Sequence, residues 1–244
     1  MRTFIFTTMI FLCSPSSADV TVKSDVLRTN LIELYTSEGC SSCPPADRWF
    51  STLKNHPDLW QQLVPMAFHV DYWGYIGWKD RFSKAKYSNR QRQYARENAI
   101  PTVYTPGLVT NGKEWRNFSW KAPKSIKKQQ IGELTLSIGE ETLSIMFEPA
   151  QILATEKLVG NVALLGFEIV SNVRRGENVG RKLKHDFVVL EFKSKKMNAT
   201  QGAYHVTTKR PTSKVDAGRY AIAAWISTDN AQEPLQAVGA WLGD

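Results

Sequence analysis

Two cysteines, separated by only two residues, constrain the fold more than any other feature of this sequence. Cys40 and Cys43 lie in a stretch that reads Ser-Glu-Gly-Cys-Ser-Ser-Cys-Pro-Pro. The apolar, β-competent residues 31–36 precede the pair, and residues 44–54 have the apolar spacing of a helix. The two prolines fit a first helical turn, where backbone N–H groups have no intrahelical acceptor. We therefore expect the pair to lie between a strand and the helix that follows it.

The residues after this helix predict an α/β arrangement. Residues 64–70 form a near-continuous apolar run, which is typical of a buried parallel strand, and strand–helix–strand makes a βαβ unit. We predict a polar helix over 83–98, and we place it on the surface because its apolar face is thin. A short strand over 108–110 should turn back at Asn111-Gly112, a strong hairpin signal.

The pattern changes in the second half of the chain. Residues 134–138 and 143–147 alternate around a turn, and further strands are predicted over 160–170, 187–192, 220–226 and 235–241. No helical pattern interrupts them, and strands in succession predict a β-sandwich or a related antiparallel domain. We therefore expect an α/β domain over residues 19–122, followed by an all-β, sandwich-like domain over 131–244.

The N-terminus has the features of a signal peptide. Arg2 is followed by an apolar run over residues 3–13, and residues 16–18 have the small-x-small pattern of a cleavage site. We expect residues 1–18 to be removed and the protein to be periplasmic or secreted; an anchor that is never cleaved is the alternative. The run is too short to span a bilayer, and we expect no integral membrane segment in the mature chain.

The charge of the chain says little about partners. The formal net charge is +8, and such an excess can indicate nucleic acid, anionic lipid or acidic partners. Because the Lys and Arg residues are scattered and the protein is expected to be exported, we predict no nucleic acid partner. We interpret the charge mainly as a contribution to solubility, with adhesion to an anionic envelope surface as a second interpretation.

The cysteine pair predicts redox chemistry. Cys13 would leave with the signal peptide, so Cys40 and Cys43 would be the two cysteines of the mature chain. A thiolate attacks a disulfide, and a helix N-terminus favours the thiolate. We expect an exposed Cys40 to attack and Cys43 to resolve the mixed disulfide, while Glu38 would oppose thiolate formation if it pointed inward. The alternative is a local disulfide that merely closes a turn; a four-ligand zinc site lacks a second cysteine pair.

A resemblance to a known family rests on several of these stretches. Residues 33–47, 68–73, 77–80 and 104–106, with a further match at 175–181, resemble the thioredoxin superfamily and most closely an exported bacterial family called domain of unknown function 1223. The resemblance implies a thioredoxin-like fold for residues 19–122. It also implies that Thr105 and a cis Pro106 face the dithiol as substrate-binding residues; Pro101 is the competing candidate. The chain departs from ordinary thioredoxins in the two prolines after Cys43 and in a long insertion over 71–100.

Other polar residues leave several interpretations open. His69 and Asp71 share one face of the predicted strand. One of them could accept a proton from Cys43, or His69 could complete a Cu(I) site with Cys40 and Cys43, or the two could be a structural pair. The aromatic loop 72–78 could line a peptide groove or simply pack. Residues 174–181 could bind an acidic partner, fold back onto the first domain, or form an ordinary hairpin loop.

The sequence therefore leaves three functions open. The leading hypothesis is thiol–disulfide exchange on protein or small-thiol substrates, with Cys40 and Cys43 as catalytic residues and with no cofactor and no metal. The second is a copper chaperone that uses Cys40, Cys43 and His69. The third is a non-catalytic interaction protein on a thioredoxin scaffold.

Overall fold

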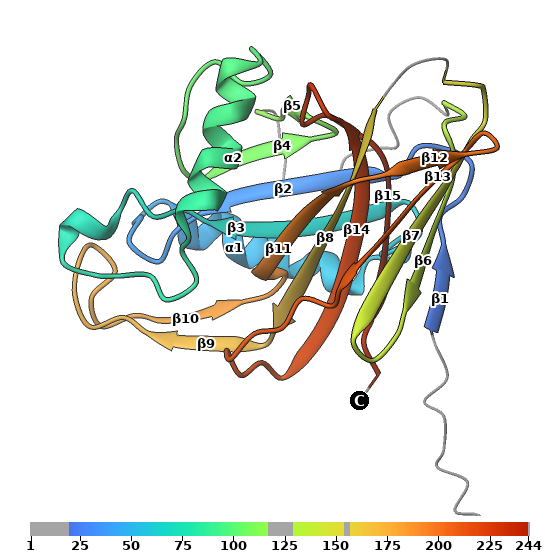
Figure 1. Cartoon of the computed structure of the whole chain (residues 1–244). Coiled ribbons are helices and arrows are strands. Elements are labelled where there is room, and N and C mark those ends of the chain that lie inside the picture. The colour runs from blue at the N-terminus through green and yellow to red at the C-terminus, as the bar shows by residue number, and fades with distance from the viewer. Residues whose placement is uncertain (1–19, 117–128, 154–156, 244) are drawn as a thin grey trace, which may run out of the picture.

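The computed structural model describes residues 20–116, 129–153 and 157–243, which form a mixed α/β protein (Figure 1). The helices are α1 (Cys43–Thr52) and α2 (Ala85–Arg96). The strands of the first half are β1 (Val20–Lys23), β2 (Asn30–Thr36), β3 (Leu63–His69), β4 (Gly107–Thr110) and β5 (Lys113–Glu114). Those of the second half are β6 (Gly132–Ile138), β7 (Thr142–Pro149), β8 (Leu158–Phe167), β9 (Ile169–Asn172), β10 (Lys182–His185), β11 (Val188–Lys196), β12 (Asn198–Thr200), β13 (Ala203–Lys209), β14 (Arg219–Thr228) and β15 (Pro234–Trp241).

The predicted βαβ unit is confirmed. β2 and β3 pair in parallel from Asn30↔Leu63 to Thr36↔His69, with α1 between them in the chain. β4 then pairs antiparallel with β2 and turns back into β5. The turn falls at Asn111 and Gly112, whose φ angles are 48° and 78°, as the Asn-Gly signal predicts.

The strands of both halves join in one sheet. Its order is β15-β14-β8-β11-β3-β2-β4-β5, and β11 meets β3 in parallel at Val188↔Ala67. A second, antiparallel sheet has the order β1-β6-β7-β13-β12, so the first strand of the chain pairs with the second half. The division into domains 19–122 and 131–244 stays a prediction, and both the signal peptide and the segment expected to join the domains lie outside the described residues.

Side-chain alternation explains why the central strands are apolar on both faces. On β8, Ala163 and Leu165 belong to a core shared with β2, β3 and α1, whereas Val162 and Leu164 belong to a core shared with β6 and β7. The five-stranded sheet covers this second face (Figure 1). The eight-stranded sheet is therefore packed on both sides, and the second half contains strands and no helix within its described residues.

The prediction that α2 lies on the surface is wrong. Its apolar face is thin, but Tyr87, Tyr94 and Arg90 are buried. Arg90 donates two hydrogen bonds of 2.8 Å to the carboxylate of Glu33, which lies in the middle of β2. The hydroxyls of Tyr35 and Tyr94 donate to the same carboxylate, at 2.7 and 2.6 Å. A polar network thus buries this helix face in place of an apolar stripe.

One glycine joins the two halves closely, and its replacement is a test of this packing. A Cβ atom added to Gly239 on β15 would collide with the indole ring of Trp60. That ring also packs edge-on against Phe167, Phe187 and Trp241. We expect Gly239→Ala to lower the free energy of unfolding by about 1–3 kcal/mol, the usual cost of overpacking. Denaturant unfolding measures this.

Gly243, two residues after the end of β15, offers a matched control. A Cβ at the exposed Gly243 would meet no atom within 4 Å. Gly243→Ala should leave the unfolding midpoint almost unchanged. Equal effects of the two substitutions would contradict the packing of Trp60 on Gly239.

Candidate functional site

The cysteine pair closes the turn between β2 and α1. Cys40 and Cys43 form a disulfide, with their Cα atoms 5.4 Å apart. Cys43 is the first residue of α1, and Ser42 is its N-cap. The Cys43 amide donates to the Cys40 carbonyl at 3.2 Å, and the Ser42 hydroxyl lies 3.3 Å from the Cys40 sulfur. Because the chain enters the helix here, both sulfurs lie at its N-terminus, as predicted.

The prediction that Cys40 is exposed is wrong. Both cysteines are 0% exposed, while Ser41 and Ser42 between them are open to solvent. The loop between β9 and β10, residues 173–181, binds the cysteine turn, and we call it the cover loop. It folds back against the first half, beside the loop that follows β3 (Figure 1). Residues 174–181 belong to the loop of the β9–β10 hairpin, as one interpretation expected, and this loop also folds back onto the first half of the chain, as another expected. Binding of an acidic partner stays a prediction.

Two side chains of the cover loop bind the cysteine turn directly. Asn178, which is 0% exposed, donates its amide hydrogens to the carbonyls of Glu38 and Cys40, at 2.8 and 2.9 Å. The carboxylate of Glu177 accepts the backbone N–H of Ser41 at 3.0 Å. Hydrogen bonding with the side chain of Ser41, and then with its backbone N–H, holds the pKa of Glu177 below its usual range. The turn is thus held by a segment almost 140 residues further along the chain.

A buried group of acids and histidines lies behind the turn. Its members, all at most 8% exposed, are Glu38, Asp47, His69, Asp80 and His185. His69 Nδ1 lies 2.6 Å from Asp80 Oδ2, and His185 Nε2 lies 3.3 Å from Glu38 Oε1. The two imidazole rings are 5.2 Å apart. Opposite charges and hydrogen bonds therefore compensate groups that burial would otherwise discharge.

The pKa of each carboxylate in this group is shifted by the surroundings of that carboxylate. Burial acts to raise the pKa of Glu38, but interaction with His185 outweighs it, so the pKa is lowered. Burial also opposes the charged form of Asp80, and the charge of His69 reverses this, so its pKa is lowered as well. For Asp47, one helical turn after Cys43, burial prevails and raises the pKa. Glu38 does point inward, and Trp78 Nε1 donates to it at 2.8 Å.

His69 pairs with a residue that the sequence did not indicate. Its expected neighbour Asp71 is exposed and bonds instead with Ser88 of α2. Burial would lower the pKa of His69, but the charge and hydrogen bond of Asp80 raise it to about 8. Asp80 also accepts the backbone N–H groups of Glu38 and Phe82, at 2.9 Å each. The predicted structural pair of His69 with Asp71 is therefore wrong, because His69 pairs with Asp80. A role of His69 as proton acceptor for Cys43 stays a prediction.

The second predicted part of the site is the segment before β4. The Thr105–Pro106 peptide bond is cis, whereas Pro101 follows a trans bond, so the expectation that Pro106 is the cis proline is confirmed. The hydroxyl of Thr105 accepts the indole N–H of Trp73 at 2.8 Å. Trp73 in turn packs beside Gly39, where an added Cβ would come within 3.0 Å of the Trp73 Cβ. The aromatic loop therefore links the cis-proline segment to the cysteine turn; substrate binding by Thr105 and Pro106 stays a prediction.

The structure does not support the copper interpretation. Among residues 20–116, 129–153 and 157–243, no three His, Cys, Asp or Glu side chains are grouped as metal ligands. His69 is occupied by Asp80, and both cysteine sulfurs are in the disulfide. In the same described part of the chain, no helix has the length and apolar character needed to cross a membrane.

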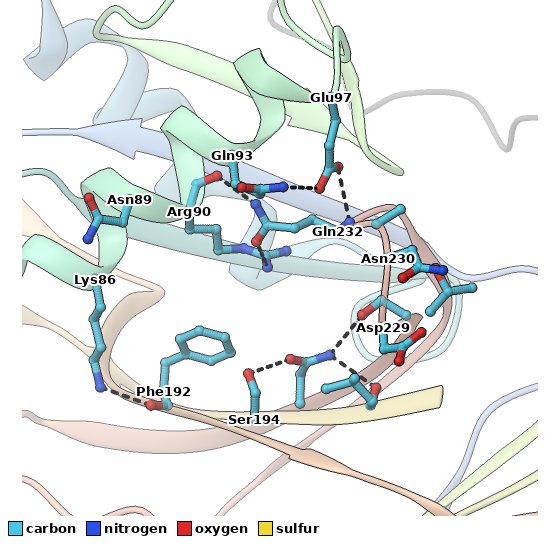
Figure 2. A pocket seen from close by; sticks show the side chains of 15 residues that line it. Lys86, Asn89, Arg90, Gln93, Glu97, Phe192, Ser194, Asp229, Asn230 and Gln232 are labelled. Atoms are coloured by element: carbon cyan, nitrogen blue, oxygen red, sulfur yellow. Dashed lines mark hydrogen bonds between the residues drawn. The ribbon is translucent and has the colours of Figure 1, made fainter. Parts of the chain in front are cut away.

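A separate cavity of about 340 Å³ lies between α2 and the strands of the second half (Figure 2). Its polar groups bind one another. Arg90 donates to the side chain of Gln232, and the Glu97 carboxylate accepts from the Gln93 side chain and from the backbone N–H of Gln232. Ser194 likewise donates to Asn161. The cavity contains none of the residues at the cysteine turn, and we interpret it as a polar joint between α2 and the large sheet.

The βαβ unit, the disulfide at the start of α1 and the cis proline before β4 define a mixed α/β protein with a Cys-x-x-Cys site. The cover loop and the buried histidine pair lie beside that site. The chain belongs to the protein family of unknown function DUF1223, which matches residues 31–227. No curated protein matches the sequence significantly.

Solved structures show the same fold. Protein AGR_C_4864 from Agrobacterium tumefaciens, known from an X-ray crystal structure, is 22% identical, with a TM-score of 0.56 over 88% of this chain and 94% of that chain. HBP35 of Porphyromonas gingivalis is 12% identical, with a TM-score of 0.62 over 90% of this chain and 76% of that chain. At these identities the likeness concerns the fold and carries no information about activity.

Proposed function

We propose that this protein catalyses thiol–disulfide exchange on protein or small-thiol substrates through Cys40 and Cys43. The observation that carries the proposal is the disulfide at the N-terminus of α1, in the same fold as a cis Pro106. The positive end of the helix dipole favours a thiolate, and the two-residue spacing keeps the second sulfur within bonding reach. Thr105 and Pro106 are the proposed substrate-binding residues.

The reaction is a balanced exchange of two electrons and two protons. The Cys40 thiolate attacks one sulfur of a substrate disulfide and releases the other as a thiol. Cys43 then attacks the Cys40 sulfur, which restores the Cys40–Cys43 disulfide and releases the second substrate thiol. An external dithiol reductant returns the pair to its reduced state. Since both cysteines are fully buried in the disulfide form, the segments around the turn must move before any partner reaches the sulfurs.

Glutathione disulfide provides the test. With Cys43→Ser, we expect a lasting mixed disulfide between Cys40 and glutathione, because no resolving thiol remains. With Cys40→Ser, we expect little adduct, since Cys43 begins α1 and is fully buried. Mass spectrometry of the intact protein measures both. An adduct that forms equally on either variant, or on neither, would contradict this division of roles.

The complete burial of the sulfurs favours one second candidate, a non-catalytic protein in which the disulfide is structural. Equilibration with dithiothreitol separates the two candidates. A pair that stays oxidised at potentials below about −300 mV would be structural, whereas exchange catalysts lie between about −270 and −120 mV.

The organisation and location of the protein complete the proposal. We propose that residues 19–122 form the thioredoxin-like domain that carries the chemistry, and that residues 131–244 form a sandwich-like domain that supplies its cover. The signal-peptide pattern of residues 1–18 supports a periplasmic or secreted location, where disulfides persist.

A further inference from the structure

The cover loop places a carboxylate where a thiolate would otherwise be stabilised. Glu177 accepts the N–H of Ser41, the residue between Cys40 and the N-cap of α1. The first turn of α1 contains no acidic residue, and Ser42 makes no side-chain capping bond. The negative charge at this helix N-terminus therefore comes from the second half of the chain.

In the reduced protein, the Cys40 thiolate and the Glu177 carboxylate would both place negative charge at the N-terminus of α1. The positive end of the helix dipole lowers the pKa of a thiol that lies there. A second negative charge beside the same helix end opposes ionisation of the thiol, because like charges repel, and the Ser41 N–H beside Cys40 is already bound to Glu177. Less thiolate means a weaker nucleophile, and a less stable reduced state wherever the thiol ionises.

We propose that Glu177 is a positioning residue that restrains the reactivity of Cys40 by holding its carboxylate at the N-terminus of α1. The proposal rests on the proposed exchange function and adds its regulation by the cover loop. Displacement of the loop would remove this carboxylate from the N-terminus of α1, together with Arg174, Arg175 and Arg181 of the same loop. The test therefore changes Glu177 alone and leaves these arginines in place.

Other ionisable groups face the same turn and stay constant in the test. They are Glu38 before the turn, Asp47 on α1, His69 on β3, Asp80 after it, and His185 on β10. All five lie behind the turn and are buried, whereas Glu177 is exposed and acts from the solvent side. A substitution of Glu177 therefore changes one charge without changing the buried group.

The test is the alkylation rate of the fully reduced protein by iodoacetamide, measured against pH. The midpoint of that profile reports the ionisation of the first thiol, while its plateau reports access. Glu177→Gln keeps an acceptor for Ser41 and removes the charge. We expect its midpoint to move to lower pH, by about a two- to fivefold increase in the ionisation constant, the range of a charge at a helix end. The shift should shrink in high salt.

Two further variants keep the result interpretable. Glu140→Gln removes an equally exposed charge in the turn between β6 and β7, and should leave the profile unchanged. Asn178→Ala loosens the cover loop and should raise the plateau. Above the thiol midpoint, the dithiol form of Glu177→Gln should also gain two- to fivefold in its equilibrium with glutathione, or about 10–20 mV.

The outcomes separate this inference from the function on which it rests. If Glu177→Gln and Glu140→Gln give the same midpoint, or if the midpoint of Glu177→Gln rises, Glu177 does not restrain Cys40. That result would leave the exchange function standing, provided that the pair is reduced by glutathione or dithiothreitol. If neither reagent reduces the pair, the proposed function itself fails.

Discussion

Replacing Arg90 by methionine should lower the free energy of unfolding by about 3–5 kcal/mol, the cost of leaving a buried charge without its partner. Arg90 is 6% exposed and Glu33 is 1% exposed, so the Glu33 carboxylate could not recover its hydration. The guanidinium also lies over the rings of Phe68 and Trp225, with centroid distances of 5.7 and 5.2 Å. Denaturant unfolding measures the change, and the melting temperature should fall by roughly 6–20 °C.

Two controls distinguish the ion pair from a general effect on α2. Arg96→Met changes an exposed arginine of the same helix and should cost less than about 0.5 kcal/mol. The double variant Arg90→Met with Glu33→Gln removes both charges and still offers Tyr35 and Tyr94 an acceptor. It should be more stable than Arg90→Met alone. A loss below about 1 kcal/mol in Arg90→Met would contradict the buried pair.

The pKa of His69 predicts the second large effect, a loss of stability in mild alkali. Its folded value of about 8 lies above the ordinary value of 6.5 because Asp80 binds the imidazolium. The stabilisation is therefore fully present below pH 6.5 and is lost as the pH rises through 8. A shift of this size corresponds to about 2 kcal/mol. With the disulfide intact, the free energy of unfolding should fall by that amount between about pH 6.5 and 8.5.

A pair of histidine variants tests the assignment. His69→Gln removes the titrating group and should flatten the pH dependence of stability over this range. His205→Gln removes an exposed histidine on β13 and should leave the slope as it is. Stability that stays constant, or rises, between these pH values in the unmodified protein would show that His69 is not held in its charged form.

The parts of the fold that follow local rules could be predicted from the sequence. β2, α1 and β3 each carry their own apolar pattern, and Asn111 and Gly112 specify their turn chemically. In the second half, β6, β7, β8, β11, β14 and β15 were also predicted in outline, whereas β10, β12 and β13 were not. The break between β8 and β9 was missed, because Glu168 adopts a positive φ of 58° that no residue pattern indicated.

Contacts between distant segments could not be predicted in the same way. Asn178 meets the turn from far along the chain, and a polar loop gives no sign of the strand end that it covers. His185 finds Glu38 across a similar separation. One signal was available: Glu33 stands in the middle of an otherwise apolar strand, and a carboxylate there requires a buried cation. Arg90 meets that requirement, and it lies on α2, the helix whose apolar face is too thin to explain its burial by apolar packing alone.

The late position of the cover loop in the sequence has a consequence for biosynthesis. Cys40 and Cys43 are synthesised long before residues 173–181. The pairing of β3 with β11 at Val188 likewise forms only after the second half has been synthesised. Throughout that interval the cysteine turn has neither Asn178 nor Glu177 against it. We therefore expect the two sulfurs to meet the oxidants of their compartment first as an open pair. Their pairing would be decided during synthesis, and the finished protein would then enclose the result.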